Sequence, residues 1–290
     1  MTTASEWVQG ARPRTLGAAI VPVVVATALA STAAPTIWWR AIAALVVALA
    51  LQIGVNYAND YSDGVRGTDA ERRGPLRLTA TGTATPTAVR TAALLAFAVA
   101  AIVGLTLSIA VDLRLLLVGG ASIAAAALYT GGPRPYGYSG LGEVAVLCFF
   151  GFVATLGTVF VLLDRLPGAA WIAALAVGLP AVGILVVNNL RDIETDRVAG
   201  KRTLAVRIGA ARTRALFAAA LVGALIAVIA LGFVHPWALL GLVALPFALG
   251  PIRIVQQHRD PPSLVRALVA TARFQLVLGG LLAIGLEVSR

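Results

Sequence analysis

Long apolar runs separated by short polar segments constrain the fold of this chain more than any other feature. Of its 290 residues, 59% are hydrophobic and 12% are charged, whereas about a quarter of a soluble domain is charged. A transmembrane helix needs about 20 mostly apolar residues. Runs near this length are 15–34, 38–58, 88–110, 113–130, 141–163, 169–189, 213–234, 236–256 and 267–287. We therefore predict an all-α, polytopic membrane protein with nine transmembrane helices, formed as a single domain over residues 1–290.

The positive charges alternate between the loops and predict an orientation in the bilayer. The net charge is +10, with 23 Lys and Arg residues. All of these fall on one side of the predicted membrane except Arg40, Arg114, Arg165 and Arg290. Because cytoplasmic loops collect Lys and Arg, we expect a cytoplasmic N-terminus and a multi-pass protein of the cell membrane. The alternation indicates the lipid bilayer as the partner and argues against nucleic acid.

Two acidic stretches end the second and sixth predicted spans, both on the cytoplasmic side. They are Asn56–Asp69, with the sequence NYANDYSDGVRGTD, and Asn188–Arg202, with the sequence NNLRDIETDRVAGKR. Carboxylates beside hydrocarbon are costly unless a cation faces them, so they indicate a functional site. The shared Asn-x-x-x-Asp spacing is a weak internal repeat. It favours two halves that face each other across a central cavity open to the cytoplasmic side.

The spacing within each stretch predicts a set of metal ligands. Helix positions i, i+3 and i+4 share a face, which aligns the amide and carboxylate oxygens of each stretch. Hard oxygen ligands of this kind suit Mg²⁺. The predicted ligands are Asn56, Asp60, Asp63, Asp192 and Asp196, with Asp69 as a further candidate. Asn56 either binds the ion or orients a carboxylate.

Basic residues follow both stretches and complete a site for a polyphosphate. Arginine binds phosphate through two hydrogen bonds and lysine binds it as a point charge. The candidates are Arg66, Arg73, Arg77, Lys201 and Arg202. Arg12 and Arg14 begin the first span at the same depth, and they either bind the substrate or act only as topology signals. We expect a substrate with a charged phosphate group and a long apolar tail.

These motifs resemble the UbiA superfamily of intramembrane prenyltransferases, over nearly the whole chain. Besides the two acidic stretches, the markers are ARPRTL at 11–16, RGPLRL at 73–78, YTGGPRPYGYSGLGE at 129–143 and the continuation of the second stretch to 209. The Asp-x-x-Asp spacing at 60–63 and the 129–143 segment are most similar to the branch that prenylates 1,4-dihydroxy-2-naphthoate.

The resemblance implies transfer of a polyprenyl group from its diphosphate to the naphthoate in menaquinone biosynthesis. CO₂ and diphosphate are lost and demethylmenaquinol forms, with Mg²⁺ assisting ionisation of the allylic diphosphate. Asp60, Asp63, Asp192, Asp196 and Tyr129 are then the catalytic candidates. Further substrate-binding candidates are Thr130, Tyr136, Tyr138, Asn188 and Asn189. All five tyrosines lie in or beside the motifs, where ring faces would stabilise an allylic cation. An interfacial tyrosine belt is the alternative for Tyr136 and Tyr138.

Two other functions remain open at this stage. A related prenyltransferase acting on another acceptor, such as 4-hydroxybenzoate, would share the metal site. An ion-coupled transporter is the more distant alternative, because transporters place their charges near the bilayer midplane and these carboxylates lie at helix ends.

Overall fold

The computed structural model describes residues 2–67 and 77–290, and within these ranges the regular structure is helical throughout. The long helices are α2 (Gly17–Ser31), α3 (Trp38–Val65), α4 (Pro86–Ala110), α5 (Leu115–Leu128), α7 (Ala154–Leu163), α8 (Gly168–Arg191), α10 (Leu204–Gly232), α11 (Leu245–Gln257) and α12 (Pro261–Val288). Shorter elements are α1 (Ala4–Gly10), η1 (Pro13–Thr15), η2 (Tyr136–Ser139), α6 (Gly142–Val146), η3 (Leu147–Val153), α9 (Ile193–Val198) and η4 (Pro236–Ala244).

The described residues contain seven helices that are long and apolar enough to cross a membrane. The bent pair Ala4–Thr15 and Gly17–Ser31, with an angle of 54° between its parts, brings the number to eight if it counts as one span. α5 has 14 residues, which at 1.5 Å per residue reach only about 21 Å of a core of about 30 Å. The all-helical membrane architecture is confirmed, whereas the predicted number of nine spans is not.

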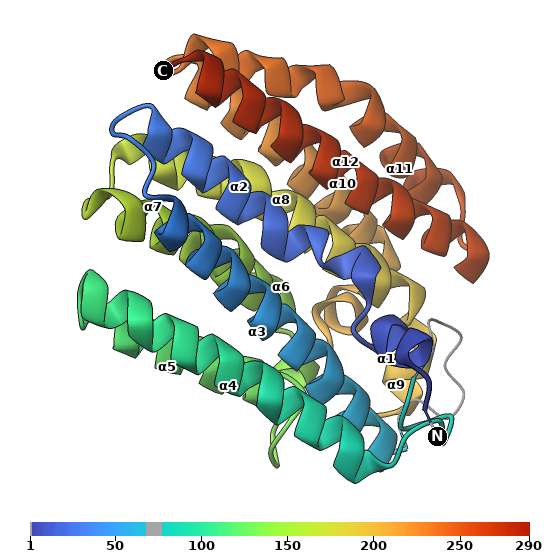
Figure 1. Cartoon of the computed structure of the whole chain (residues 1–290). Helices are drawn as coiled ribbons and strands as arrows, with labels where there is room; N and C mark the ends of the chain where they lie inside the picture. Colours follow the sequence, from blue (N-terminus) through green and yellow to red (C-terminus); the bar gives the residue numbers. More distant parts are fainter. Residues whose placement is uncertain (1, 68–76) are drawn as a thin grey trace.

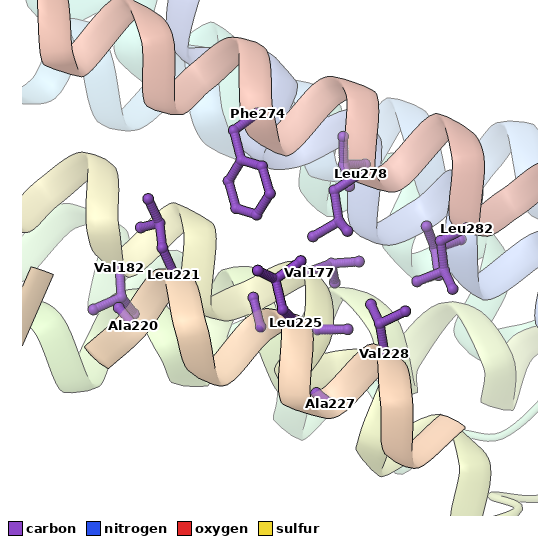
Figure 2. Close-up of a cluster of buried hydrophobic side chains, with 14 of the residues drawn as sticks. Val177, Val182, Ala220, Leu221, Leu225, Ala227, Val228, Phe274, Leu278 and Leu282 are labelled. Atoms are coloured by element: carbon purple, nitrogen blue, oxygen red, sulfur yellow. The ribbon is translucent and has the colours of Figure 1, made fainter. Parts of the chain in front are cut away.

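The main apolar core lies where α8 packs against α10 and α12. Figure 2 shows Phe274 and Leu278 of α12 above Leu221 and Leu225 of α10, with Val177 of α8 between them. Alanine and glycine allow close approach of membrane helices. At Gly178 of α8, a Cβ atom would lie 2.6 Å from the Cα atom of Gly151 in η3. These contacts pack α8, whose C-terminal end begins the second acidic stretch, closely against the rest of the bundle.

A cavity of about 520 Å³ lies among α2, α3, α4, α5 and the continuous helical segment from α6 to α7. Its walls are mostly Ala, Val, Leu and Gly side chains. The segment η3 is a π-helix, an arrangement frequent at functional sites, and it contributes Phe149 and Phe150 to the wall. Polar side chains enter the lining through Gln52, Asn56 and Asn59 of α3.

The short helices α1 and α9 lie at the same end of the bundle (Figure 1). The C-terminal end of α3 meets the turn at 77–84 there, and Lys201, which follows α9, contacts the same end of α3. We call this end, with its two acidic stretches, the polar end. The fold therefore places an apolar cavity next to a cluster of buried carboxylates.

Candidate active site at the polar end

The first acidic stretch forms the last turns of α3, and its carboxylates are buried. Asn56 and Asp63 are each 3% exposed and Asp60 is 1% exposed. Gln52, Asn56, Asn59 and Asp63 are spaced by four, three and four residues, so they follow one face of the helix. The first acidic stretch is therefore helical, as its spacing predicted, up to the end of α3. The row of polar side chains on this face begins at Gln52, one turn before Asn56.

Backbone amides of the turn at 77–84 hold the Asp60 carboxylate. The N–H of Leu78 donates to Oδ2 at 2.8 Å and the N–H of Thr79 donates to Oδ1 at 2.9 Å. Hydrogen bonds to an ionised carboxylate are roughly twice as strong as neutral ones. Asp60 is therefore fixed in one orientation while it keeps further lone pairs for a ligand.

A small apolar cluster keeps this turn in place. The Leu78 side chain is fully buried and packs with Tyr57, Ala84, Val89 and Ala93. The Tyr57 hydroxyl donates to the Trp7 carbonyl of α1 at 2.8 Å, and the two rings meet edge to face. The N-terminal helix thus covers the turn that orients Asp60.

An ion pair joins the two acidic stretches across the polar end. Lys201 Nζ lies 3.2 Å from Asp63 Oδ1, and both side chains are buried. The Tyr138 hydroxyl also donates to Asp63, while the Lys201 ammonium lies 4.6 Å from the centre of the Tyr138 ring. The carbonyl of Tyr138 accepts from the N–H of Arg202 at 2.9 Å. These contacts bring together three segments that the sequence places far apart.

In the second stretch, Asp192 stands where α8 ends and α9 begins. Arg191 donates to both Asp192 oxygens, each at 2.7 Å, and to the Asn188 amide oxygen at 2.9 Å. The backbone bonds from Asp192 to Asn188 and from Asp196 to Asp192 continue across the break. Consequently Asn188, Asp192 and Asp196 keep a helical alignment, and Arg191 is a cation of the site that sequence reasoning missed.

Asn189 contacts a buried carboxylate that was also not predicted. Its Nδ2 donates to Glu143 Oε1 at 3.0 Å, and Glu143, near the start of α6, is 6% exposed. Glu143 closes the 129–143 segment, so its position beside a marker motif was the available signal.

Asn56 ties α3 to the segment before α2. Its Nδ2 donates to the Ala11 carbonyl at 2.8 Å and to Thr15 Oγ1 at 3.1 Å. The neighbouring Arg12 has a φ of 54°, a backbone conformation uncommon outside glycine. Arg12 is half-buried at this strained position, whereas Arg14 is exposed.

Two tyrosines form a wall where the cavity meets the polar end. Tyr129 and Tyr136 both line the cavity, and their ring centres are 5.4 Å apart in an edge-to-face contact. The Tyr136 hydroxyl donates to the Ala125 carbonyl at 2.8 Å. Burial raises the pKa of Tyr136 to about 12. Thr130, next to this pair, donates to Asn59 Oδ1 at 2.6 Å.

Arg66 lies against the loop that follows α5. It donates to the carbonyls of Thr130 and Gly132, and its guanidinium lies 5.6 Å from the centre of the Tyr138 ring. Arg77 is half-buried and Arg202 is exposed at the polar end. Asp69 and Arg73 lie outside the described residues.

Within the ranges 2–67 and 77–290, no three His, Cys, Asp or Glu side chains gather into a group that could hold a metal ion. The oxygen-rich side chains lie instead in two pairs, one on α3 and one at the α8–α9 junction, each with a cation bound to one carboxylate. The assignment of metal ligands therefore stays a prediction.

The family profile of the "UbiA prenyltransferase family" matches residues 19–277 of the chain. The chain belongs to this family. It is 47% identical to 1,4-dihydroxy-2-naphthoate octaprenyltransferase of Mycobacterium tuberculosis, over 98% of the chain and 99% of that protein. It is 37% identical to the Escherichia coli protein of the same name, over 98% of the chain and 96% of that protein.

Solved structures support the same fold at low identity. A UbiA homologue from Aeropyrum pernix has a TM-score of 0.71 at 16% identity, with 93% of the chain and 97% of that structure covered. A homologue from Archaeoglobus fulgidus bound to DMAPP and Mg²⁺ has a TM-score of 0.64 at 14% identity, with 96% and 99% covered. The family and its multi-pass membrane fold are thereby established.

Proposed function

We propose that this protein transfers a polyprenyl group from polyprenyl diphosphate to 1,4-dihydroxy-2-naphthoate. CO₂ and diphosphate are lost and demethylmenaquinol forms, a step of menaquinone biosynthesis. The relatives at 47% and 37% identity are named for this activity, and the chain matches each of them over nearly its whole length. The structural observation that carries the proposal is the apolar cavity that adjoins buried carboxylates and cations at the polar end.

The cavity suits the isoprenoid tail of the donor. Its lining is almost wholly apolar, and it extends from Asn56 and Tyr129 at the polar end to Leu107 and Val161 deeper in the bundle. Apolar surface buried from water contributes about 25 cal/mol per Å², so burial of the tail favours binding of the donor. The diphosphate then lies at the polar end.

The cations of the polar end suit the diphosphate. Lys201 and Arg191 are buried and already hold carboxylates, so phosphate oxygens can take over their hydrogen bonds without new desolvation. Further proposed diphosphate ligands are Arg12, Arg14, Arg66, Arg73, Arg77 and Arg202. Of these, Arg66 also supports the loop of Tyr138 through two carbonyls.

The buried oxygen donors fit Mg²⁺ by their chemistry. Asp60, Asp63, Asp192 and Asp196 are carboxylates exposed by 9% or less, and Asn56 adds an amide oxygen. Hard oxygen ligands with open positions for phosphate oxygens are what Mg²⁺ takes. These five residues, with Asp69, would hold the ion, which when bound neutralises charge on the leaving diphosphate.

The remaining residues bind and orient the reactants. The Tyr129 and Tyr136 rings face the cavity where the allylic carbon would lie, and ring faces attract a developing cation. Thr130 and Tyr138 fix Asn59 and Asp63 through their hydroxyls. Asn188 accepts a hydrogen bond from Arg191, and Asn189 donates one to Glu143. The apolar wall excludes water, which would otherwise capture the allylic cation.

The proposal includes a topology. We infer nine membrane crossings in one domain over residues 1–290, with α5 as a short span that is completed by its flanking residues. The excess of Lys and Arg on one side supports a cytoplasmic N-terminus and an active site open to the cytoplasm. The cell membrane is the proposed location.

A product assay tests the function. Detergent-purified protein would receive polyprenyl diphosphate, 1,4-dihydroxy-2-naphthoate and Mg²⁺, and products would be identified by mass spectrometry. A prenylated naphthoquinol that lacks the carboxyl group is expected. EDTA should stop its formation and added Mg²⁺ should restore it. Product formation that persists in EDTA would contradict the metal assignment, and absence of this product would contradict the acceptor.

A further inference from the structure

Glu143 is a buried carboxylate for which the proposed reaction has so far no use. One oxygen, Oε1, accepts from Asn189 at 3.0 Å. The other, Oε2, is buried and has no hydrogen-bond partner among the described residues. A buried acceptor without a partner costs about 1–3 kcal/mol, and more when the group is charged. A vacant acceptor at this depth therefore points to a ligand that donates a hydrogen bond.

The helix faces that carry Glu143 and Asn189 also form the cavity wall. Val146 follows Glu143 by three residues on α6, and Leu185 precedes Asn189 by four residues on α8, so each pair shares a helix face. Both Val146 and Leu185 line the cavity. Glu143 and Asn189 thus lie one turn from the wall, towards the polar end.

The aromatic pair lies on the same side. A Cβ atom on Gly142, the residue before Glu143, would lie 3.2 Å from the Tyr129 hydroxyl and 3.2 Å from Leu185 Cδ2. Tyr129 and Leu185 are both cavity residues. The vacant carboxylate oxygen therefore belongs to the region where the tail-binding cavity, Tyr129 and the second acidic stretch meet.

The chemistry of the two substrates distinguishes which of them this oxygen takes. A diphosphate presents only oxygen acceptors, which a carboxylate repels. A dihydroxylated aromatic ring presents O–H donors. We propose that Glu143, oriented by Asn189, accepts a hydrogen bond from a phenolic hydroxyl of the aromatic acceptor and selects for acceptors that carry it. The inference rests on the proposed function, since it assigns a place to that acceptor.

The contact also favours the reaction. A phenolic O–H that donates to a carboxylate gains oxyanion character, and its ring becomes more nucleophilic towards the allylic carbon. Glu143 acts without a change of its own covalent bonds. A site that hydrogen-bonds a substrate hydroxyl strongly rejects analogues that lack it, because its buried groups are left without partners.

Matched acceptors and variants test this contact. The values of kcat/KM would be measured for 1,4-dihydroxy-2-naphthoate and for 1-hydroxy- and 4-hydroxy-2-naphthoate, with the wild type, Glu143→Gln and Glu143→Met. For the wild type, kcat/KM should be about 100-fold lower with the monohydroxy analogue that lacks the bound hydroxyl than with the dihydroxy acceptor, in line with the loss of one charged hydrogen bond. In both variants kcat/KM for the dihydroxy acceptor should fall by a similar factor. Their kcat/KM values for the dihydroxy acceptor and for that monohydroxy analogue should differ by less than about threefold, and their KM for polyprenyl diphosphate should stay at the wild-type value.

Glu287→Gln is the matched control, because Glu287 also accepts one side-chain hydrogen bond, from Ser31 at 2.9 Å, but lies near the C-terminal end of α12, at the end of the bundle away from the polar end. Unchanged discrimination in the Glu143 variants, or an equal loss with all acceptors, would overturn the inference and leave Glu143 a structural residue. Should the variants not fold, a structure of the wild type with 1,4-dihydroxy-2-naphthoate decides. A hydroxyl about 3 Å from the Glu143 carboxylate is expected, and a ring bound elsewhere overturns the contact. Failure of the proposed function itself would show separately, as absence of product from the wild type.

Discussion

Asp63 and Lys201, which are 138 residues apart in the chain, form a buried ion pair with 3.2 Å between Oδ1 and Nζ. The pair connects the end of α3 to the loop after α9, and the Tyr138 ring lies beside it. Each acidic stretch thus completes the other: one supplies the carboxylate and the other supplies the cation. This relationship makes the polar end one site instead of two.

Removing Lys201 should destabilise the protein. Lys201→Met removes a buried cation that pairs with Asp63, and breaking a buried pair in this way costs about 3–5 kcal/mol. The thermal unfolding midpoint of the detergent-solubilised protein should fall by several degrees. Arg197→Met is the control, since Arg197 pairs with Glu194 on an exposed surface, where a pair contributes about 0–1 kcal/mol. Equal midpoints for the two variants would contradict the role of the pair.

Asp60→Asn should remove turnover without unfolding the chain. The amide oxygen can still accept one of the two backbone N–H groups that Asp60 holds, but the charge that would bind Mg²⁺ is lost. Product formation should fall to background while the elution profile stays that of a folded protein, and the unfolding midpoint should fall by only a few degrees because one buried N–H loses its acceptor. Asp112→Asn changes a carboxylate at the turn before α5 and should retain full turnover. Normal activity of Asp60→Asn would refute its assignment as a ligand.

Gly157→Leu should shorten the longest donor that the protein accepts. Gly157 lines the cavity, and a Cβ atom there would meet no atom within 4 Å, so a larger side chain enters space proposed for the tail. Turnover of long polyprenyl diphosphates should drop about tenfold or more relative to a short one. Gly250→Leu also meets open space, but outside the cavity, and should leave the preference unchanged. The same preference in both variants would show that the tail lies elsewhere.

Tyr136 should remain neutral at all ordinary working pH values. Burial raises its pKa from 10.0 to about 12, so the folded state holds this proton more tightly than the unfolded state. Its contribution to stability is complete below pH 10 and is lost as the pH rises through about 12. In an ultraviolet titration of tyrosinate, Tyr136→Phe should remove a residue that ionises late. Loss of signal below pH 10 in this variant would contradict a buried hydroxyl.

Much of the site was predictable because local helix geometry and charge decide it. The stripe of Asn56, Asp60 and Asp63 follows from helical spacing alone, and burial in apolar surroundings made it a functional candidate. Gln52 and Asn59 lie on the same face of the helix. Gln52 is one turn before Asn56, and Asn59 lies between Asn56 and Asp63, so the same helical spacing could have predicted both.

Other features depend on tertiary contacts that no local pattern contains. The turn that orients Asp60 is 18 residues away in the chain, and the partner of Asn189 is 46 residues away. The predicted number of nine spans exceeds the number of helices long enough to cross the membrane. One reason is that the run 113–130 folds as a helix of only 14 residues.

Competition between two acceptors tests the central claim most directly. Purified protein would receive Mg²⁺, a polyprenyl diphosphate and equimolar 1,4-dihydroxy-2-naphthoate and 4-hydroxybenzoate, and products would be separated by mass. We expect prenylated naphthoquinol that has lost CO₂ and no prenylated hydroxybenzoate. Prenylated hydroxybenzoate as the main product would contradict the naphthoate assignment while leaving the chain in its prenyltransferase family.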